Sequence, residues 1–235
     1  ITFFKTEAGY LAREHAPISA QQVATDPAFQ RTRENNAEFA KAGKAAALLR
    51  NAIRPVLQKA KDSRVTPRLL TEFLKVIKAD ATNPRGQRNV IDGETELLQG
   101  FNFNSNAPLG STLFAAQTAT INRVTGQLTI DIPSFVPEQA IVAPAGTTHF
   151  KILASAAAIN FEQEEYESSA EETAMLPLDA APTAAINLAC TVTPNSTHPL
   201  FLVSGIQFYQ HVNGNYYSLK DGSFNSLQLV KVSGV

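Results

Sequence analysis

The chain has 235 residues, of which 44% are hydrophobic and 17% are charged, and its formal net charge is −1. Soluble domains average about 25% charged residues, so this chain is poor in charge as well as nearly neutral. Electrostatic repulsion between copies is therefore weak, and the composition favours self-association. The single cysteine, Cys190, excludes an intrachain disulfide, and no run of about 18 apolar residues is present to form a membrane-spanning helix. We expect a cytoplasmic protein, with an extracellular filament as the alternative.

Residues 1–14 predict a β-hairpin arm. The first six residues favour a strand, Gly9 provides a turn, and residues 10–13 return alongside. An isolated two-stranded hairpin is only marginally stable in water, so its apolar side chains must cover another surface. Those side chains are Phe3, Phe4, Tyr10 and Leu11. Residues 15–25 are predicted as a linker that spans about 35 Å when extended, so the arm can reach its own body or a neighbouring subunit.

Residues 26–99 predict a helical domain. The pair Asp26-Pro27 is typical of a helix start, because a capping side chain precedes a proline at the first helical position. Apolar and small residues then recur at helical spacing up to Pro55, which ends or kinks the helix. The pair Thr66-Pro67 predicts the start of a second helix in the same way. We expect the two helices to form a helical hairpin.

Residues 100–235 predict an antiparallel β-sandwich. Short alternating segments separated by turn signals are typical of an immunoglobulin-like sandwich, and Asn213-Gly214 is a strong signal for a two-residue hairpin turn. The expected strands are 118–122, 128–132, 149–153, 156–161, 184–192, 200–210, 216–219 and 226–232. The predicted fold class is α+β, with the N-terminal β-hairpin and the helical hairpin preceding the sandwich.

Charge divides the chain into two parts of opposite sign. Residues 1–99 carry 16 Lys and Arg against 11 Asp and Glu, a net charge of +5, whereas residues 100–235 carry 4 against 10, a net charge of −6. Complementary surfaces suit a head-to-tail contact between copies, which builds a ring or an open helix. We predict an assembly interface made of Phe3, Phe4, Tyr10, Leu11, Arg31, Arg33, Lys41, Lys44, Glu162, Glu164, Glu165 and Glu167. The acidic members have a second interpretation, as a solvated strand edge whose charge blocks unwanted pairing.

No motif for catalysis or cofactor binding is recognisable. The chain lacks a phosphate-binding glycine loop, a nucleophile elbow and a zinc-binding helix motif. Its four histidines are His15, His149, His198 and His211, and none has a second ligand at metal-binding spacing. Cys190 lacks a basic neighbour and is expected to be a small buried side chain. We therefore predict no enzyme, no cofactor and no metal. We expect the basic segment 85–88 to be a structural loop, with anion binding as the alternative.

Two other functions stay open. Phe208, Tyr209, Tyr216 and Tyr217 flank the predicted turn and would suit a β-sandwich binding module for carbohydrate or protein, although cross-strand packing also explains them. The basic helices would suit a nucleic-acid-associated protein. Acidic residues interrupt the basic ones, however, and no aromatic stacking platform stands among them, so the sequence does not favour nucleic acid as a partner.

A resemblance to known proteins is carried by the segments 1–6, 9–13, 25–35, 38–39, 44–50, 85–90, 224–225 and 229–232. On these segments the chain resembles an uncharacterised family of Bacteroidetes proteins along nearly its whole length. The family has no assigned activity, so the resemblance implies no catalytic residue. Its members usually carry a leader with Gly and Lys before the hairpin, so we expect that residues before Ile1 are missing. In size and type the chain is also similar to subunits of cytoplasmic fibrils in gliding bacteria. We predict a self-assembling structural subunit of a filament or fibril, whose partner is itself.

Overall fold

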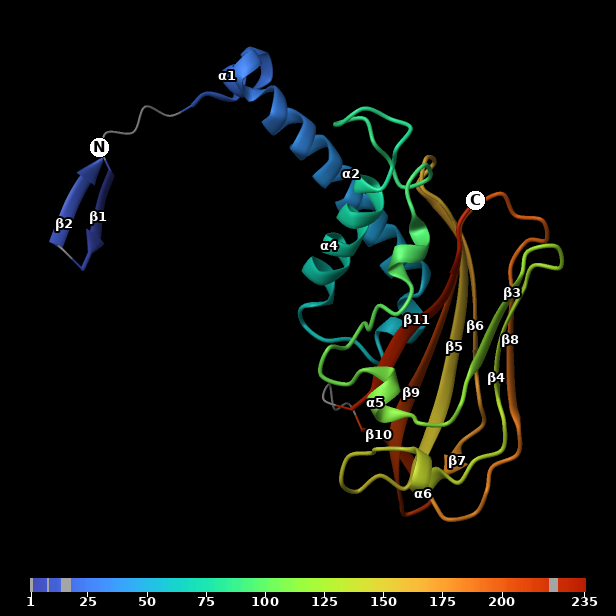
Figure 1. Ribbon diagram of the computed structural model, residues 1–235. Coiled ribbons are helices and arrows are strands. Elements are labelled where there is room, and N and C mark those ends of the chain that lie inside the picture. The colour runs from blue at the N-terminus through green and yellow to red at the C-terminus, as the bar shows by residue number, and fades with distance from the viewer. Residues whose placement is uncertain (1, 8, 14–17, 220–223) are drawn as a thin grey trace.

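The computed structural model describes residues 2–7, 9–13, 18–219 and 224–235 (Figure 1). His15 and the first residues of the predicted linker lie outside this part of the chain. The helices are α1 (Ala20–Thr25), α2 (Gln30–Ala52), α3 (Arg54–Leu57), α4 (Val65–Lys78), α5 (Leu109–Thr112) and α6 (Pro137–Ala140), with 3-10 turns η1 (Pro27–Phe29) and η2 (Thr95–Leu98). The strands are β1 (Thr2–Thr6), β2 (Gly9–Arg13), β3 (Thr118–Asn122), β4 (Gln127–Ile132), β5 (His149–Asn160), β6 (Glu165–Glu172), β7 (Leu176–Pro177), β8 (Ile186–Thr191), β9 (Leu200–Val212), β10 (Asn215–Ser218) and β11 (Ser226–Ser233).

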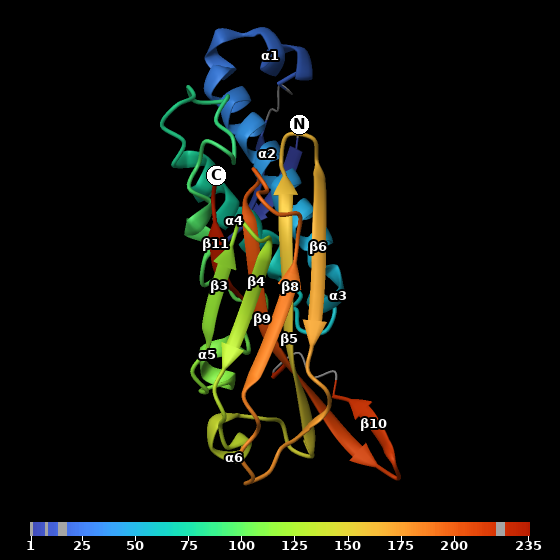
Figure 2. The same ribbon diagram turned by 90° about the vertical axis from the view of Figure 1, so that its right-hand side faces the viewer.

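The body of the molecule has three layers (Figures 1 and 2). Helices α2 and α4 cover one face of a large sheet, and a small sheet covers the other face. The large sheet has the order β10-β9-β5-β6, while β11 also pairs with β9 and β7 also pairs with β5. The small sheet has the order β3-β4-β8. Each strand pair among the described residues is antiparallel.

Strand β5 lies at the centre and is buried on both faces. Because successive side chains in a strand point to opposite faces, its residues divide between two cores. Leu153, Ala157 and Ile159 face the helices, and they share a hydrophobic cluster with Leu49 and Phe73. The other face belongs to a second cluster with the small sheet, which includes Phe150, Ile152, Ala154, Ala156, Leu128, Ile130 and Cys190. The helices and the large sheet therefore share one core, which crosses the expected boundary between residues 99 and 100.

The helices begin and end close to the predicted positions, with three corrections. Asp26 does cap a helical turn, since its Oδ1 accepts from Ala28 N at 2.9 Å, but that turn is η1, and α2 follows from Gln30. Thr66 is not the cap of α4, which already begins at Val65; its hydroxyl instead accepts from Arg50 Nη1 at 3.0 Å. The expected linker is partly helical, because α1 occupies residues 20–25 with a capping box at Ser19.

The strand predictions hold for most of the sheet. The expected pairs 118–122 with 128–132 and the Asn213-Gly214 turn are confirmed, with positive φ angles of 51° and 80° at the turn residues. The two segments expected at 149–153 and 156–161 form the single strand β5. The α+β class is confirmed, and the immunoglobulin-like topology stays a prediction. No helix among the described residues has the length and apolar character needed to cross a membrane.

Candidate functional site

The β1–β2 hairpin stands apart from the body in Figure 1. Its register pairs Phe3 with Ala12, Phe4 with Leu11 and Lys5 with Tyr10. The exposed fractions are 74% for Phe3 and 79% for Tyr10, with 43% for Phe4 and 48% for Leu11. Two strands are too few to bury these four large apolar side chains in a core of their own. The hairpin therefore needs a partner surface to be stable.

A groove of about 540 Å³ runs beside α2, between that helix, the loop after α4 and the turn that joins β5 to β6. The larger side chains of its apolar wall are Leu48, Val90, Ile91, Phe161 and Tyr166. Phe161 is anchored from behind by edge-to-face contacts with Phe73 and Phe201, at centroid distances of 5.9 and 6.1 Å. The apolar wall of the groove is therefore packed against the core of the molecule, and we call the groove the α2 groove.

Charged residues surround the rim of the α2 groove. Lys44 Nζ lies 2.6 Å from Glu164 Oε1, so an ion pair joins α2 to the β5–β6 turn. Lys41 Nζ donates to the main-chain carbonyls of Gln87 and Arg88, at 2.5 and 2.8 Å. Glu162 also lines the groove and is exposed. The structure thus brings four of the predicted interface residues together within one chain.

The loop that forms one wall of the groove is fixed to α2 by a buried ion pair. Arg88 Nε donates to Glu38 Oε1 at 2.7 Å and Arg88 Nη2 donates to Oε2 at 2.9 Å, while Gly86 N donates to Oε1 at 2.8 Å. The side-chain hydrogen bond from Arg88 holds the pKa of Glu38 below its usual value. Gly86 has φ +88°, and a Cβ there would lie 2.9–3.1 Å from atoms of Glu34, so glycine permits this close approach.

The same loop folds around a second buried carboxylate, Asp80, which is 4% exposed. Its oxygens accept from the main-chain N–H groups of Thr82, Asn83 and Asn89, at 2.8 to 3.0 Å, and from the Asn83 side chain at 2.9 Å. Burial by itself would raise the pKa of Asp80, but the hydrogen bonds outweigh burial and lower it to about 2. The hydrogen bonds of Gly86 and Arg88 to Glu38 agree with the expectation that residues 85–88 form a structural loop.

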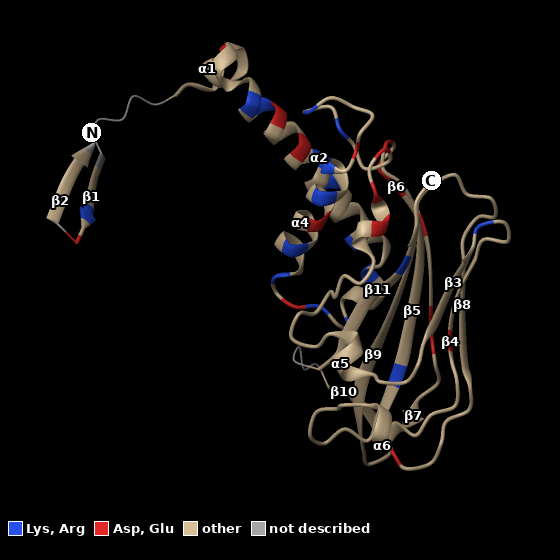
Figure 3. Ribbon diagram, in the orientation of Figure 1, with Lys and Arg blue, Asp and Glu red and all other residues tan. Residues whose placement is uncertain are grey.

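The remaining predicted interface residues lie elsewhere or serve local contacts. Arg33 Nη1 donates to the carbonyls of Val23 and Asp26, at 2.7 and 2.9 Å, and so ties α1 to α2. Glu167 Oε2 accepts from Thr193 N at 2.9 Å, between β6 and the end of β8. Arg31 and Glu165 are exposed. Figure 3 shows the basic residues concentrated on the helical layer and few charges on the sheets.

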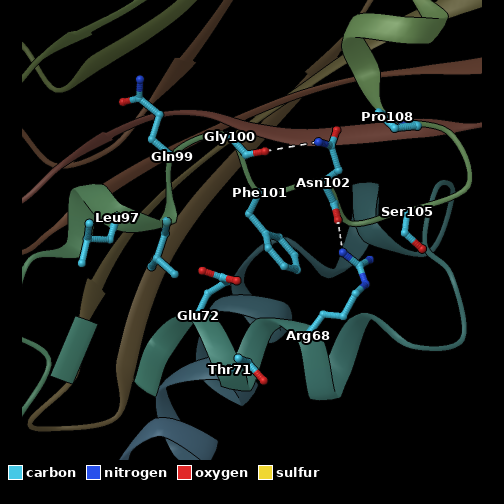
Figure 4. Close-up of a pocket in the computed structure, with 11 residues that line it drawn as sticks. Arg68, Thr71, Glu72, Leu97, Gln99, Gly100, Phe101, Asn102, Ser105 and Pro108 are labelled. Atoms are coloured by element: carbon cyan, nitrogen blue, oxygen red, sulfur yellow. Dashed lines mark hydrogen bonds between the residues drawn. The ribbon is translucent and has the colours of Figure 1, made fainter. Parts of the chain in front are cut away.

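A second pocket, of about 580 Å³, lies between α4 and the loop after η2 (Figure 4). Arg68 makes three contacts in this pocket. Its guanidinium lies 5.0 Å from the centre of the Phe101 ring. Its Nη1 donates to Asn102 O at 2.8 Å, and its Nη2 forms an ion pair with Asp62 Oδ2 at 2.6 Å. Glu72 at its rim pairs with Lys75 on the same helix. These polar groups hold α4 to the loop, and the pocket is explained as part of the fold.

A cluster of aromatic rings lies where β5, β9 and β10 meet in the large sheet, and the sequence analysis did not predict it. His149 on β5 and His211 on β9 lie with ring centres 5.6 Å apart, and Tyr216 on β10 stacks on His211 at 4.6 Å. The histidines are distant in sequence, so only the strand register could have revealed them. Burial and the nearby His211 lower the pKa of His149. No group of three or more His, Cys, Asp or Glu side chains within the described residues is placed to hold a metal ion.

The expected aromatic binding face is only partly available. Phe208 is fully buried in the core, whereas Tyr216 and Tyr217 are 47% and 57% exposed. Cys190 is buried between the sheets, and burial raises the pKa of its thiol to about 11. That thiol is therefore protonated and inert at neutral pH.

The fold defines the α+β class, and comparisons with known proteins do not assign the chain to a family. No family model, no curated protein and no solved structure matches the chain. The geometry of the hairpin and the α2 groove therefore carries the functional argument.

Proposed function

We propose that the protein is a structural subunit that assembles with copies of itself by placing its N-terminal hairpin on a neighbour. The observation that carries this proposal is the exposure of Phe3 and Tyr10 on an element without a core. Hydrophobic residues scattered singly over a surface need no explanation, but an apolar cluster on a detached hairpin marks an interaction surface. In this proposal the partner is a copy of the chain, and each copy both gives a hairpin and receives one.

Such a contact is heterologous, since the surface that gives differs from the surface that receives. A heterologous contact repeats from copy to copy and yields a ring if the rotation closes and a filament if it does not. The low charge content supports close association. The immunoglobulin-like topology and the filament form both belong to this proposal.

The experiment compares the full chain with a variant lacking residues 1–14, by light scattering and negative-stain electron microscopy. We expect the full chain to form species larger than one subunit and the shortened chain to be a folded monomer. Phe114→Ser is the matched control: Phe114 is 61% exposed outside the hairpin, so its loss should leave assembly unchanged. A full chain that is monomeric at every concentration, or a shortened chain that keeps the full particle size, would overturn the proposal.

One observation favours a second candidate, a binding module. Tyr216 and Tyr217 are exposed on β10, the outermost strand at that end of the sheet. Exposed tyrosines supply rigid area for stacking on a ligand. A monomeric chain that binds glycans on an array, and loses binding in Tyr217→Ser, would support this candidate. Nucleic-acid binding gains no comparable support, because Arg33, Arg50 and Arg68 all donate hydrogen bonds within the chain.

A further inference from the structure

The two faces of the hairpin differ in chemistry. One face carries Phe3, Lys5, Tyr10 and Ala12. Phe3 pairs with Ala12 and Lys5 pairs with Tyr10. Paired residues point to the same face, and so do residues two positions apart on one strand. This face carries the two most exposed aromatic rings of the hairpin, and Lys5 Nζ lies 5.6 Å from the centre of the Tyr10 ring. The surface that receives it must therefore be apolar and must offer a carboxylate at its border.

The α2 groove offers both features. Its wall of Leu48, Val90, Ile91, Phe161 and Tyr166 is apolar, and its volume of about 540 Å³ is of the size that binds organic groups, roughly 300–1,000 Å³. Two aromatic side chains would bury roughly 300–500 Å² there. Glu162 stands at the rim and takes part in no ion pair among the described residues, whereas Glu164 is already paired with Lys44.

The sheet edges are weaker candidates for receiving the hairpin. β6 forms one edge of the large sheet, but glutamates stand along it, and charged side chains on an edge strand oppose the addition of another strand. β10 is an edge strand of only four residues, so it offers few main-chain partners for an added strand. The α2 groove instead provides a formed apolar surface.

We propose that the α2 groove of one copy binds the Phe3–Tyr10 face of the hairpin of a second copy, with Lys5 paired to Glu162. This inference rests on the proposed function, because it names the receiving surface of the same assembly. Each copy keeps its own hairpin for the next copy in line, so the contact extends the assembly in one direction.

The first test fills the groove without touching the hairpin. Ala47 lines the α2 groove and Ala37 lies exposed on the same helix outside it, so Ala47→Trp and Ala37→Trp form a matched pair. We expect Ala47→Trp to be a folded monomer by circular dichroism and light scattering, and Ala37→Trp to assemble as the wild type does. Ala47→Trp that is folded and assembles normally would overturn the inference.

The second test exchanges the proposed charges, and it does not depend on tolerance of a bulky residue. Lys5→Glu should weaken assembly, and adding Glu162→Lys should restore it, whereas adding Glu138→Lys on α6 should not. Failure of Glu162→Lys to restore assembly, or equal recovery with Glu138→Lys, would argue against the pairing.

A disulfide test separates contact with a second copy from folding back on the same copy. Tyr10→Cys and Ala47→Cys are prepared separately and mixed under oxidising conditions, while the buried Cys190 stays inert. We expect a disulfide-linked dimer, and we expect none when Val124→Cys, at the distant β3–β4 turn, replaces Ala47→Cys. A double variant Tyr10→Cys/Ala47→Cys that closes an internal disulfide and stays monomeric would overturn the inference.

The outcomes distinguish the two proposals. If removal of residues 1–14 abolishes assembly but Ala47→Trp does not, the proposed function stands and the receiving surface lies elsewhere. If removal of residues 1–14 leaves assembly intact, the proposed function itself falls.

Discussion

Lys44 on α2 and Glu164 in the β5–β6 turn form an ion pair within one chain, with an N–O distance of 2.6 Å across 120 residues of sequence. The opposite charges of the two parts of the chain are thus partly satisfied inside the subunit. Lys59 and Glu172 repeat the pattern at 2.5 Å, whereas Lys151 pairs with the same Glu172 within the large sheet, also at 2.5 Å. Charge complementarity therefore contributes to holding the helical layer on the sheet, and the apolar hairpin carries the proposal of assembly.

The exposed Lys44–Glu164 pair should contribute little to stability. The side chains are 68% and 55% exposed, so solvent screens the attraction. We expect Lys44→Ala to change the free energy of unfolding by less than about 1 kcal/mol in urea denaturation. A loss of several kcal/mol would show that the pair is not screened in this way.

The buried Glu38–Arg88 pair should contribute far more. The side chains are only 4% and 19% exposed, so removing one partner leaves the other charge buried without compensation. We expect Glu38→Ala to lower the free energy of unfolding by about 3–5 kcal/mol, measured by urea denaturation. Glu34→Ala is the control, because Glu34 Oε2 lies 3.6 Å from Arg85 Nε in a longer and more exposed ion pair. We expect Glu34→Ala to lower the free energy of unfolding by about 1 kcal/mol or less. Equal effects of the two substitutions would contradict the assigned role of the buried pair.

Asp80 should make the protein sensitive to acid. Its pKa is about 2 in the folded chain and 3.8 in the reference state, so the folded state binds its proton at lower pH than the unfolded chain does. Its contribution, of the order of 2 kcal/mol, is present above pH 3.8 and is lost as pH falls to about 2. We expect the difference in unfolding free energy between the wild type and Asp80→Asn to shrink across this interval. A difference that stays constant with pH would contradict the assignment.

Asn225 should act as a junction between the helical layer and the large sheet. Its Nδ2 donates to the carbonyls of Lys59 and Leu219, at 3.1 and 3.0 Å, and its Oδ1 accepts from Phe208 N at 3.2 Å. Asn225→Ala removes the hydrogen-bond partner of these three main-chain groups. Each group that is left unsatisfied lowers the free energy of unfolding by about 1–3 kcal/mol. We expect a loss of about 3 kcal/mol in thermal or urea unfolding, with Asn215→Ala on β10 close to wild type. A neutral Asn225→Ala would show that other groups replace these bonds.

Cys190 should resist thiol reagents until the protein unfolds. It is 0% exposed, and burial raises the pKa of its thiol to about 11, so thiolate is scarce at pH 8. We expect maleimide labelling to be negligible in the native protein and complete in urea. Rapid labelling of the native chain would show that the two sheets separate readily.

Much of the secondary structure could be predicted from local patterns. The Asn213-Gly214 turn and the pairing of β3 with β4 follow from residues near one another in sequence, because turn type and alternation fix a hairpin register. The Thr66 cap was wrong because its hydroxyl has a tertiary partner in Arg50. The division of 149–161 into two strands was wrong because alternation alone does not recognise a strand buried on both faces.

The sequence by itself determined the α+β class, the apolar hairpin, the separation of charge and the lack of a recognisable catalytic motif. Each of these depends on residue type or on neighbours a few positions apart. Only the tertiary structure decided that Lys44 meets Glu164, that Glu38 is buried against Arg88, and that His149 lies beside His211. These contacts join residues 50 to 120 positions apart, and such pairs are set by how the layers pack, which no local pattern records.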